Sequence, residues 1–544
     1  MFLTGIRETQ MSDWKQYFPY KQPRDQQDTA IDDILRTFHE KRFYALEAGT
    51  GVGKSAIGYT VARKILEKSP PEGYEAGAIF VTTQKLLQDQ YEKDFQKFNM
   101  RSLKSSVNYQ CNYKKHNTCA ESQTELKTVD QEDRFWKNCT YNCTYKNAKK
   151  EFLESSLSVT NFPYLMTESN YSGGIKPRQL LIIDEAHNVE TELSRFIEVA
   201  VSEKFCKSAL KLSFPSLTTH HQAYMWIKDV YWPKLESYCK HIKITLEKFK
   251  GIKQNLDKFA SLSKQLHMTE SHYKKIQQFL VYHTKENWIF DIESSQKYRM
   301  KKIVFKPIDV SKFAEQYLFR LGHKVLFMSA TLLDGDKFSE SLGIDRKDID
   351  SMSLPSPFPT KNRPILHVPM GRMTAGEIQK TLPTLAEAVT RILEQHAGEK
   401  GIIHTHSYKI SNFLKYNVKS SRLLFPESHN RDEILRKHKK SKNPTVLVSP
   451  SMTEGVDLAG DDSRFQVLCK IPYPFLGDKL VKKRMHKWKW WYSFQTAKTI
   501  IQSLGRSIRS PTDTAVTYIL DSDWSRFYRN NHTLFAKDFR DCLK

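Results

Sequence analysis

The chain has 544 residues, 39% hydrophobic and 27% charged, a composition typical of globular proteins and a length sufficient for about three or four domains. Its formal net charge of +24 favours a polyanionic partner, because neutralised phosphates release condensed counterions. A lysine-rich chain without a specific partner is the alternative interpretation of this charge. Apolar runs stay short of the ~18 residues of a membrane span, and the N-terminus lacks the apolar core of a signal peptide. We therefore expect an intracellular protein, cytoplasmic or nuclear in a eukaryote, that is neither secreted nor membrane-bound.

The first candidate site residue is Gln27, which follows Arg24 at the start of a segment with helical apolar spacing. A glutamine amide presents a paired donor and acceptor, which suit the edge of an adenine base. We predict that Gln27 contacts the base of a nucleotide. A solvated helix start is the alternative.

A glycine-rich turn at residues 47–55 reads Glu-Ala-Gly-Thr-Gly-Val-Gly-Lys-Ser, with Ala48 where the strict phosphate-loop pattern has glycine. The apolar run 43–46 precedes it and a helical pattern follows, which is the setting that a phosphate-binding loop requires. Glycines bring backbone N–H groups onto phosphate oxygens, and the helix N-terminus adds partial positive charge. We expect Lys54 to reach the β- and γ-phosphates and Ser55 to ligate Mg²⁺. The residues predicted to bind nucleotide here are Ala48, Gly49, Thr50, Gly51, Val52, Gly53, Lys54 and Ser55.

Four of the eight cysteines lie between residues 111 and 143, among lysines, asparagines and threonines rather than apolar neighbours. They are Cys111, Cys119, Cys139 and Cys143, spaced C-x7-C-x19-C-x3-C. Four thiolates can hold a 4Fe-4S cluster or a tetrahedral Zn²⁺, and the C-x2-C pairs of zinc ribbons are absent. The spacing alone leaves cluster, zinc and unligated thiols open.

A second nucleotide motif follows the apolar run 180–183 and reads Asp184-Glu185-Ala186-His187. P-loop ATPases hold Mg²⁺ with a carboxylate at the carboxyl end of such a strand, a role that suits Asp184. Glu185 is placed to orient and deprotonate the attacking water. We expect His187 to couple this site to a second lobe.

Helical spacing dominates residues 203–303, where apolar positions recur from 252 to 266 and again from 273 to 280, alongside several lysines. Farther along, residues 479–492 interleave lysines and an arginine with Trp488, Trp490 and other aromatics. Such a mixture suits a single-stranded nucleic acid with stacked bases, for which either tryptophan is a candidate platform.

Near the C-terminus, residues 502–509 read Gln-Ser-Leu-Gly-Arg-Ser-Ile-Arg. Arg506 and Arg509 lie three apart, so we expect them to share a helix face and to approach the γ-phosphate from the second lobe. Arg509 is the candidate arginine finger. A solvated basic helix is the alternative.

Together these motifs resemble the DEAH-type superfamily 2 helicases and, within them, the XPD/DinG family of iron–sulfur helicases. Further segments that carry the resemblance are 324–332, 401–408 and 453–457. It implies an α/β fold of two RecA-like P-loop ATPase lobes, with Gln502 and Asp457 joining the nucleotide site. It also favours the 4Fe-4S cluster over Zn²⁺ and makes the helical segment an arch, for which a solvated helical bundle is the alternative.

The expected domains are lobe 1 at 1–104, 150–202 and 304–345, a cysteine insertion at 105–149, a helical insertion at 203–303 and lobe 2 at 346–544. We predict an ATP- and Mg²⁺-dependent helicase, monomeric, acting on single-stranded and on duplex or forked DNA, with movement from 5′ to 3′ implied by the resemblance alone. Two rivals are a DEAH-type RNA helicase and an ATP-gated remodeller that unwinds nothing. The pathway and any repair or replication partner stay open.

Overall fold

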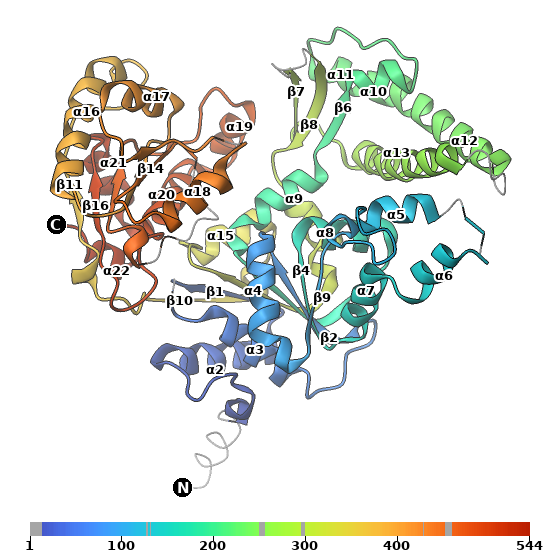
Figure 1. The fold of residues 1–544 in the computed structure, drawn as a ribbon, viewed down its shortest axis with the longest axis horizontal. Helices are drawn as coiled ribbons and strands as arrows, with labels where there is room; N and C mark the ends of the chain where they lie inside the picture. Colours follow the sequence, from blue (N-terminus) through green and yellow to red (C-terminus); the bar gives the residue numbers. More distant parts are fainter. Residues whose placement is uncertain are drawn as a thin grey trace.

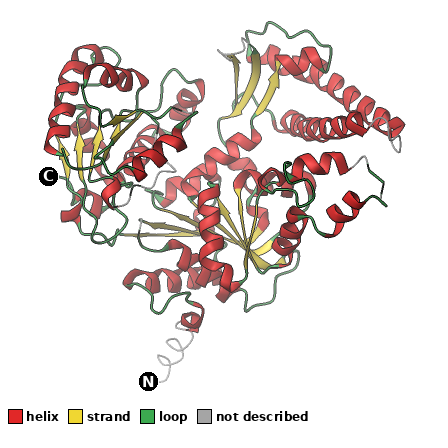
Figure 2. Ribbon diagram, viewed as in Figure 1, coloured by secondary structure: helices red, strands yellow, loops and turns green. Residues whose placement is uncertain are grey.

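A computed structural model describes residues 13–49, 51–126, 129–130, 132–249, 256–294, 300–427, 429–451, 458 and 460–544. Within these residues the strands form three sheets, two parallel and one antiparallel. Figure 1 shows an α/β lobe at each end of the sequence, with the two insertions beside the first lobe. Figure 2 shows helices packed around the two parallel sheets. Across the described part of the chain, no helix is both long and apolar enough to cross a membrane.

The first lobe is built on a parallel sheet with strand order β10-β1-β9-β5-β2-β4-β3. Its strands are nearly continuous apolar runs because helices cover both faces. The strands are β1 (Phe43–Ala48), β2 (Glu75–Thr82), β3 (Met100–Leu103), β4 (Leu157–Asn161), β5 (Arg178–Asp184), β9 (Gly322–Ser329) and β10 (Ile349–Leu354).

Two groups of helices enclose this sheet. One apolar core joins it to α2 (Asp25–Glu40), α3 (Lys54–Ile65) and α4 (Lys85–Phe95). The core on the other face joins it to α8 (Phe162–Thr167), α9 (Val189–Ile197), α14 (Ser311–Tyr317) and α15 (Gly335–Leu342). The glycine-rich turn follows β1 and Asp184 ends β5, and these two strands flank β9. Both features consequently lie at the carboxyl edge of the sheet, where open α/β sheets bind ligands.

The cysteine insertion leaves the sheet after β3 and returns at β4, two strands that pair with each other. Its helices are α5 (Cys119–Leu126), α6 (Arg134–Tyr141) and α7 (Thr144–Glu154). The insertion is therefore anchored at both ends on adjacent strands of the first lobe.

The helical insertion contains α10 (Glu203–Ser208), α11 (His220–Trp226), α12 (Trp232–Phe249) and α13 (Leu256–Tyr282). The apolar positions of 256–266 and 273–280, expected on separate helices, lie on the single helix α13; residue 252 is outside the described residues. At the root, β6 (Val199–Ser202), β7 (Trp288–Ser294) and β8 (Lys301–Pro307) form an antiparallel sheet that the helical periodicity did not predict. Helix α13 also packs against α5, so the two insertions touch (Figure 1).

The second lobe carries a parallel sheet with strand order β11-β16-β15-β12-β14-β13. Its strands are β11 (Ile365–His367), β12 (Gly401–His404), β13 (Leu423–Leu424), β14 (Val446–Ser449), β15 (Phe465–Leu468) and β16 (Val516–Ile519). Its helices are α16 (Ile378–Gln395), α17 (Tyr408–Asn417), α18 (Arg431–Lys440), α19 (Lys479–Lys487), α20 (Trp491–Leu504), α21 (Asp523–Asn531) and α22 (Lys537–Arg540).

The expected boundary between the lobes at residue 346 is wrong. Strand β10, residues 349–354, pairs in parallel with β1 and closes the edge of the first sheet. The chain crosses to the second lobe only after residue 354, because β10 completes the first sheet before the crossing.

Candidate nucleotide site between the lobes

A cleft of about 500 Å³ separates the two lobes and is lined from both sides. The predicted residues that line it are Gly49, Gly51, Gly53, Lys54, Ser55, Asp184, Glu185, His187, Gln502, Arg506 and Arg509. The structure therefore brings together side chains separated by more than 300 positions in the sequence. Thr50 and Asp457 lie outside the described residues.

The glycine-rich turn owes its shape to two glycines with positive φ, Gly51 at 90° and Gly53 at 88°. A Cβ on Gly51 would lie 2.2 Å from the ring of Phe358, so the turn also needs glycine to fit beneath that side chain. Lys54, the first residue of α3, donates its Nζ to the Ala48 carbonyl at 3.1 Å. Ala48 and Val52 are buried, and their carbonyls accept from Lys54 Nζ and Gln27 Nε2.

Gln27 lies beside the turn, but its amide is engaged there. Its Nε2 donates to the Val52 carbonyl at 2.8 Å, and its Oε1 accepts from the Arg24 N–H at 2.8 Å. Only 3% of the residue is exposed. In this conformation Gln27 supports the loop backbone and presents no free amide edge to a base, while Arg24 lines the cleft and donates to the Gly51 carbonyl.

The Asp184 carboxylate ends β5 and is held by two donors. The Glu185 N–H donates to Oδ1 at 2.9 Å, and the Tyr91 hydroxyl donates to Oδ2 at 2.9 Å. Burial raises the pKa of Asp184 to about 6, although the nearby Lys54 cation opposes this shift. A buried carboxylate beside the phosphate loop can serve as a Mg²⁺ ligand.

Glu185 adopts a left-handed backbone with φ of 54°, rare for a non-glycine residue and typical of strained functional positions. Burial raises the pKa of its carboxyl, but His187, Lys54, Arg506 and Arg509 outweigh burial, so the pKa is lowered. Glu185 is thus ionised at neutral pH and able to accept a proton or a hydrogen bond from water.

A chain of polar contacts runs from Glu185 into the second lobe. His187 Nδ1 lies 3.3 Å from Glu185 Oε2 and 2.8 Å from Ser329 Oγ. Ser329 Oγ in turn accepts from the Thr331 N–H at 3.1 Å, and Gln502 Nε2 donates to Thr331 Oγ1 at 3.2 Å. Burial lowers the pKa of His187 to about 4, so this link operates with a neutral imidazole. The path passes through the 324–332 segment and joins the lobes.

Arg506 and Arg509 line the cleft, but not from a helix face as expected. Helix α20 ends at Leu504 with Gly505 as its C-cap, so both arginines lie in the loop that follows. The Arg506 Nε donates to the Gln502 carbonyl at 3.0 Å, and the Arg509 N–H donates to Asp513 Oδ2 at 2.8 Å. A glycine is a poor helix former, and here it ends the helix before the first arginine.

Sequence reasoning missed Tyr91 and Glu47 among the residues that line the cleft. Glu47 accepts from the Leu333 N–H at 2.8 Å and from Ser353 Oγ at 2.9 Å, which ties the turn to segments after β9 and in β10. Tyr91 occupies an apolar-periodic position of α4, which reads as ordinary core. Arg24 also lines the cleft, and its place three residues before Gln27 is the sequence signal that could have identified it.

The four cysteines of the insertion are gathered in one place and all are at least 93% buried. The sulfurs of Cys119 and Cys143 lie 3.4 Å apart, and Cys139 interacts with Cys111 and Cys143. Burial, followed by contact with neighbouring thiols, raises the pKa of Cys119 to about 12 and that of Cys139 to about 11. Among the described residues, however, no group of three or more His, Cys, Asp or Glu side chains stands in an arrangement that could hold a metal ion.

Several residues of the basic and aromatic stretch 479–492, predicted to bind single-stranded nucleic acid, make contacts within the protein instead. Trp488 is 6% exposed and belongs to the interior, and the Trp490 indole donates to Glu340 Oε2 at 3.0 Å. Lys479 and Arg484 form ion pairs with acidic residues of the first lobe and the helical insertion. Neither tryptophan stands as a free platform for bases.

Comparison with known proteins gives two matching families on separate parts of the chain. Residues 389–541 match the helicase C-terminal domain, and residues 20–217 match the res subunit of type III restriction enzymes. Among solved structures, one titled "XPD_Helicase" has a TM-score of 0.64 at 17% identity and covers 95% of this chain and 99% of that one. The structure of S. tokodaii Xpd4 has a TM-score of 0.58 at 15% identity, with 96% and 99% covered.

Curated relatives include the ATP-dependent DNA helicase YoaA of Haemophilus influenzae, 26% identical over 36% of this chain and 32% of that protein. The YoaA of Escherichia coli is 24% identical over 40% of this chain and 36% of its own length. The chain thus spans about a third of these two relatives. The 3′-5′ exonuclease DinG of Bacillus subtilis is 22% identical over 92% of this chain and 69% of that protein.

Proposed function

We propose that this chain, an XPD/DinG-like superfamily 2 helicase in sequence and fold, hydrolyses ATP between its lobes and uses the energy to unwind DNA. The observation that carries the proposal is the composition of the cleft. One wall presents Lys54, Asp184 and Glu185, and the opposite wall presents Gln502, Arg506 and Arg509. Such a site is complete only when both lobes contribute, which links nucleotide chemistry to interlobe motion.

Each of these residues has a role to fill in a phosphoryl transfer reaction. The backbone N–H groups of the glycine-rich turn and the Lys54 ammonium bind the β- and γ-phosphates. Ser55 and Asp184 would hold Mg²⁺, which would neutralise charge on the phosphate oxygens. Glu185, ionised and adjacent, orients the attacking water and accepts its proton. Arg506 and Arg509 stabilise the charge that develops on the transferred group.

The chain of polar contacts from Glu185 to Gln502 couples the nucleotide site to the second lobe. Because His187 touches both Glu185 and Ser329, a change at the γ-phosphate reaches Thr331 and then Gln502 through hydrogen bonds rather than through bulk motion alone. We infer that hydrolysis alternates the cleft between closed and open states and that the lobes step along one strand.

Three observations support DNA as the substrate. The net charge is +24, the two insertions touch through α13 and α5 beside the first lobe, and both YoaA relatives are named as DNA helicases. We propose that the helical insertion is an arch, that it and the cysteine insertion frame the path of one strand, and that movement runs from 5′ to 3′.

Strand displacement by Glu185→Gln tests this function. The variant keeps the side-chain volume but removes the proton acceptor, so ATP hydrolysis and unwinding of a forked duplex should both fall by at least about 100-fold while DNA binding persists. Glu315→Gln, which alters a surface ion pair with Arg42, is the matched control. Equal unwinding by wild type and Glu185→Gln would refute the proposal.

Substrates with a single 5′ or 3′ tail decide polarity, and stimulation of hydrolysis by DNA or RNA separates the DNA helicase from the RNA helicase alternative. A protein that hydrolyses ATP on DNA yet displaces no strand would instead be a remodeller.

We further propose that Cys111, Cys119, Cys139 and Cys143 hold a 4Fe-4S cluster. What supports this proposal is that four buried cysteines lie together among α5, α6 and α7, and thiolates are the ligands that such a cluster takes. Protein purified without oxygen should contain iron and acid-labile sulfide and absorb near ~400 nm. Stoichiometric zinc in a colourless protein would replace this proposal with a tetrahedral zinc site.

A further inference from the structure

The phenol of Tyr91 reaches the nucleotide cleft from a helix that carries no recognised motif. Tyr91 lies near the C-terminal end of α4, is 1% exposed, and donates its hydroxyl to Asp184 Oδ2 at 2.9 Å. The other oxygen of that carboxylate accepts the Glu185 N–H. Each carboxylate oxygen therefore has one protein donor, and the lone pairs that remain are those available to a cation.

We propose that Tyr91 is a positioning residue for the metal-binding carboxylate of Asp184. This inference rests on the proposed ATPase function. A carboxylate held by a single donor at Oδ1 can still rotate about its Cβ–Cγ bond, whereas a second donor at Oδ2 fixes the plane of the group. Hydrogen bonds to metal ligands commonly change metal affinity by 10- to 100-fold, because they set the orientation of the ligand atoms.

The aromatic ring of Tyr91 is itself held firmly. It packs against Phe80 and Phe95, with ring centroids 5.4 and 6.0 Å away, and Tyr59 stacks on Phe95 with centroids 4.9 Å apart. The hydroxyl is thereby confined to one direction, toward Asp184. A buried tyrosine needs a hydrogen-bond partner, and here the partner is a residue of the catalytic motif.

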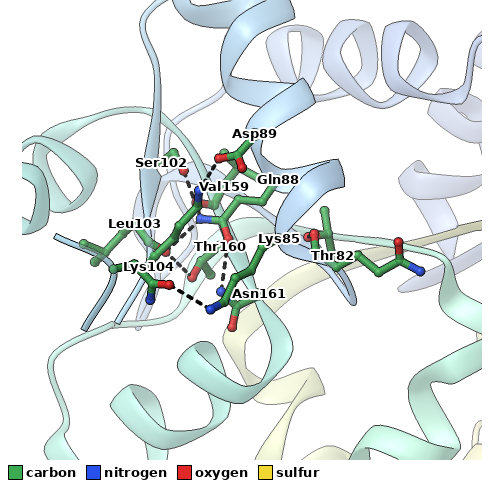
Figure 3. Close-up of polar contacts among 12 residues, drawn as sticks. Thr82, Lys85, Gln88, Asp89, Ser102, Leu103, Lys104, Val159, Thr160 and Asn161 are labelled. Carbon is green, nitrogen blue, oxygen red and sulfur yellow. Dashed lines mark hydrogen bonds and ion pairs between the residues drawn. The ribbon is translucent and has the colours of Figure 1, made fainter. Parts of the chain in front are cut away.

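The N-terminal half of α4 is fastened to the sheet by a buried glutamine, which explains how the helix keeps Tyr91 in place. Gln88 Nε2 donates to Ser102 Oγ and to the Leu103 carbonyl, both at 2.9 Å, and Gln88 Oε1 accepts from Asn161 Nδ2 at 3.0 Å (Figure 3). Gln88 is fully buried. The cysteine insertion begins after β3 and ends before β4. The hydrogen bonds of Gln88 therefore connect α4, the helix that carries Tyr91, to the base of that insertion.

A purely structural tyrosine would fill the same space, so the test removes only the oxygen. Tyr91→Phe keeps the ring and deletes the hydroxyl. Tyr59→Phe is the matched control, because it deletes a phenol from the same aromatic group without touching Asp184. The readout is the Mg²⁺ concentration that gives half the maximal ATPase rate at saturating ATP, together with thermal unfolding of each variant.

The expected result is a 10- to 100-fold rise in this Mg²⁺ concentration for Tyr91→Phe and no change for Tyr59→Phe, with similar unfolding temperatures. An unchanged Mg²⁺ requirement in Tyr91→Phe overturns the proposal, whatever happens to its stability.

Binding of Mn²⁺ with ADP, followed by electron paramagnetic resonance, keeps this test separate from the proposed function. Weaker Mn²⁺ binding in Tyr91→Phe than in Tyr59→Phe supports the positioning role even if the wild type displaces no strand. Equal binding in the two variants overturns it even if the wild type is an active helicase.

Discussion

Arg484 of the second lobe forms an ion pair with Glu190 of the first, with 2.9 Å between Nη1 and Oε1 and side chains only 7% and 12% exposed. Arg484 also donates its Nε to the Ile308 carbonyl at 2.9 Å, at the root of the helical insertion. Glu190 belongs to α9, three residues after His187, so this contact joins α19 to the segment that carries the catalytic motif. Two neighbouring ion pairs, Lys487–Asp309 and Lys479–Asp291, also join α19 to the first lobe and to the helical insertion.

The buried pair predicts a strong effect of Arg484→Met, which leaves the Glu190 carboxylate without its partner. Breaking one side of a buried ion pair costs about 3–5 kcal/mol, because an uncompensated charge stays inside. We expect a lower unfolding temperature and slower ATP hydrolysis, since the arginines of the second lobe are no longer held against the cleft.

The double variant Arg484→Met with Glu190→Leu should recover most of the stability, because both charges are then gone. Thermal unfolding of the two single variants and the double variant measures this coupling. Strictly additive losses would contradict a direct pair.

Lys54→Ala should abolish ATP hydrolysis and leave single-strand binding within about threefold of wild type, because the lysine contacts phosphate in the proposed site and lies away from the insertions. Steady-state hydrolysis and fluorescence anisotropy with a labelled oligonucleotide measure the two properties. Lys64→Ala, on the same helix α3 but paired with Glu67, is the control. Unwinding by Lys54→Ala at the wild-type rate would refute the cleft as the source of energy.

The nucleotide cleft was largely predictable, because its residues stand at the ends of apolar strands and in glycine-rich turns that have few other physical interpretations. Arg506 and Arg509 were assigned to the correct cleft but to the wrong local structure, since the helix-ending effect of Gly505 was underweighted. The Gln27 amide hydrogen-bonds a backbone carbonyl, a contact that no sequence pattern records, so its role toward a base stays a prediction. Tyr91 gave no signal at all: a buried aromatic at helical spacing looks the same whether or not its hydroxyl meets a carboxylate.

The acid limb of the ATPase activity should depend on Asp184. Its pKa is raised to about 6 by burial, so the carboxyl gains a proton as pH falls through that value and loses affinity for Mg²⁺. Glu185, whose pKa is lowered, stays ionised over the same range. We expect activity to fall between pH 7 and 5, and the midpoint to move to lower pH as Mg²⁺ is increased, because proton and cation compete. A midpoint pH that does not change with Mg²⁺ concentration would show that another group causes the loss of activity in acid.

Stability should fall with acid over the same range for a different reason. Burial lowers the pKa of His187, His272, His283 and His406 to about 4 and that of His404 to about 3, below the unfolded value of about 6.5. The unfolded chain therefore binds more protons between pH 6.5 and 4, so the free energy of unfolding rises with pH across this window. Asp184, whose folded pKa is raised, acts with the opposite sign and offsets part of the loss between pH 7 and 5.

Urea unfolding at pH 7 and pH 5 measures this loss. His404→Phe removes one of these groups and should reduce the difference by roughly 2 kcal/mol. A difference that His404→Phe leaves unchanged would show that folding does not lower the pKa of this histidine.

The last prediction concerns the cysteine insertion. Cys143 stands at the N-cap of α7 with its sulfur beside that of Cys119, so Cys143→Ser removes one donor from the centre of the proposed cluster. We expect loss of iron and of the absorbance near ~400 nm, and loss of strand displacement, because the insertion is no longer held together. ATP hydrolysis without DNA should stay within about threefold of wild type, since none of the four cysteines lines the cleft.

Cys239→Ser is the control, because Cys239 is equally buried but belongs to α12 of the helical insertion. It should keep its iron and its colour. Iron retained by Cys143→Ser at the wild-type level would exclude this thiol as a ligand, and iron lost equally from both variants would mean that the metal is not held by the four-cysteine group.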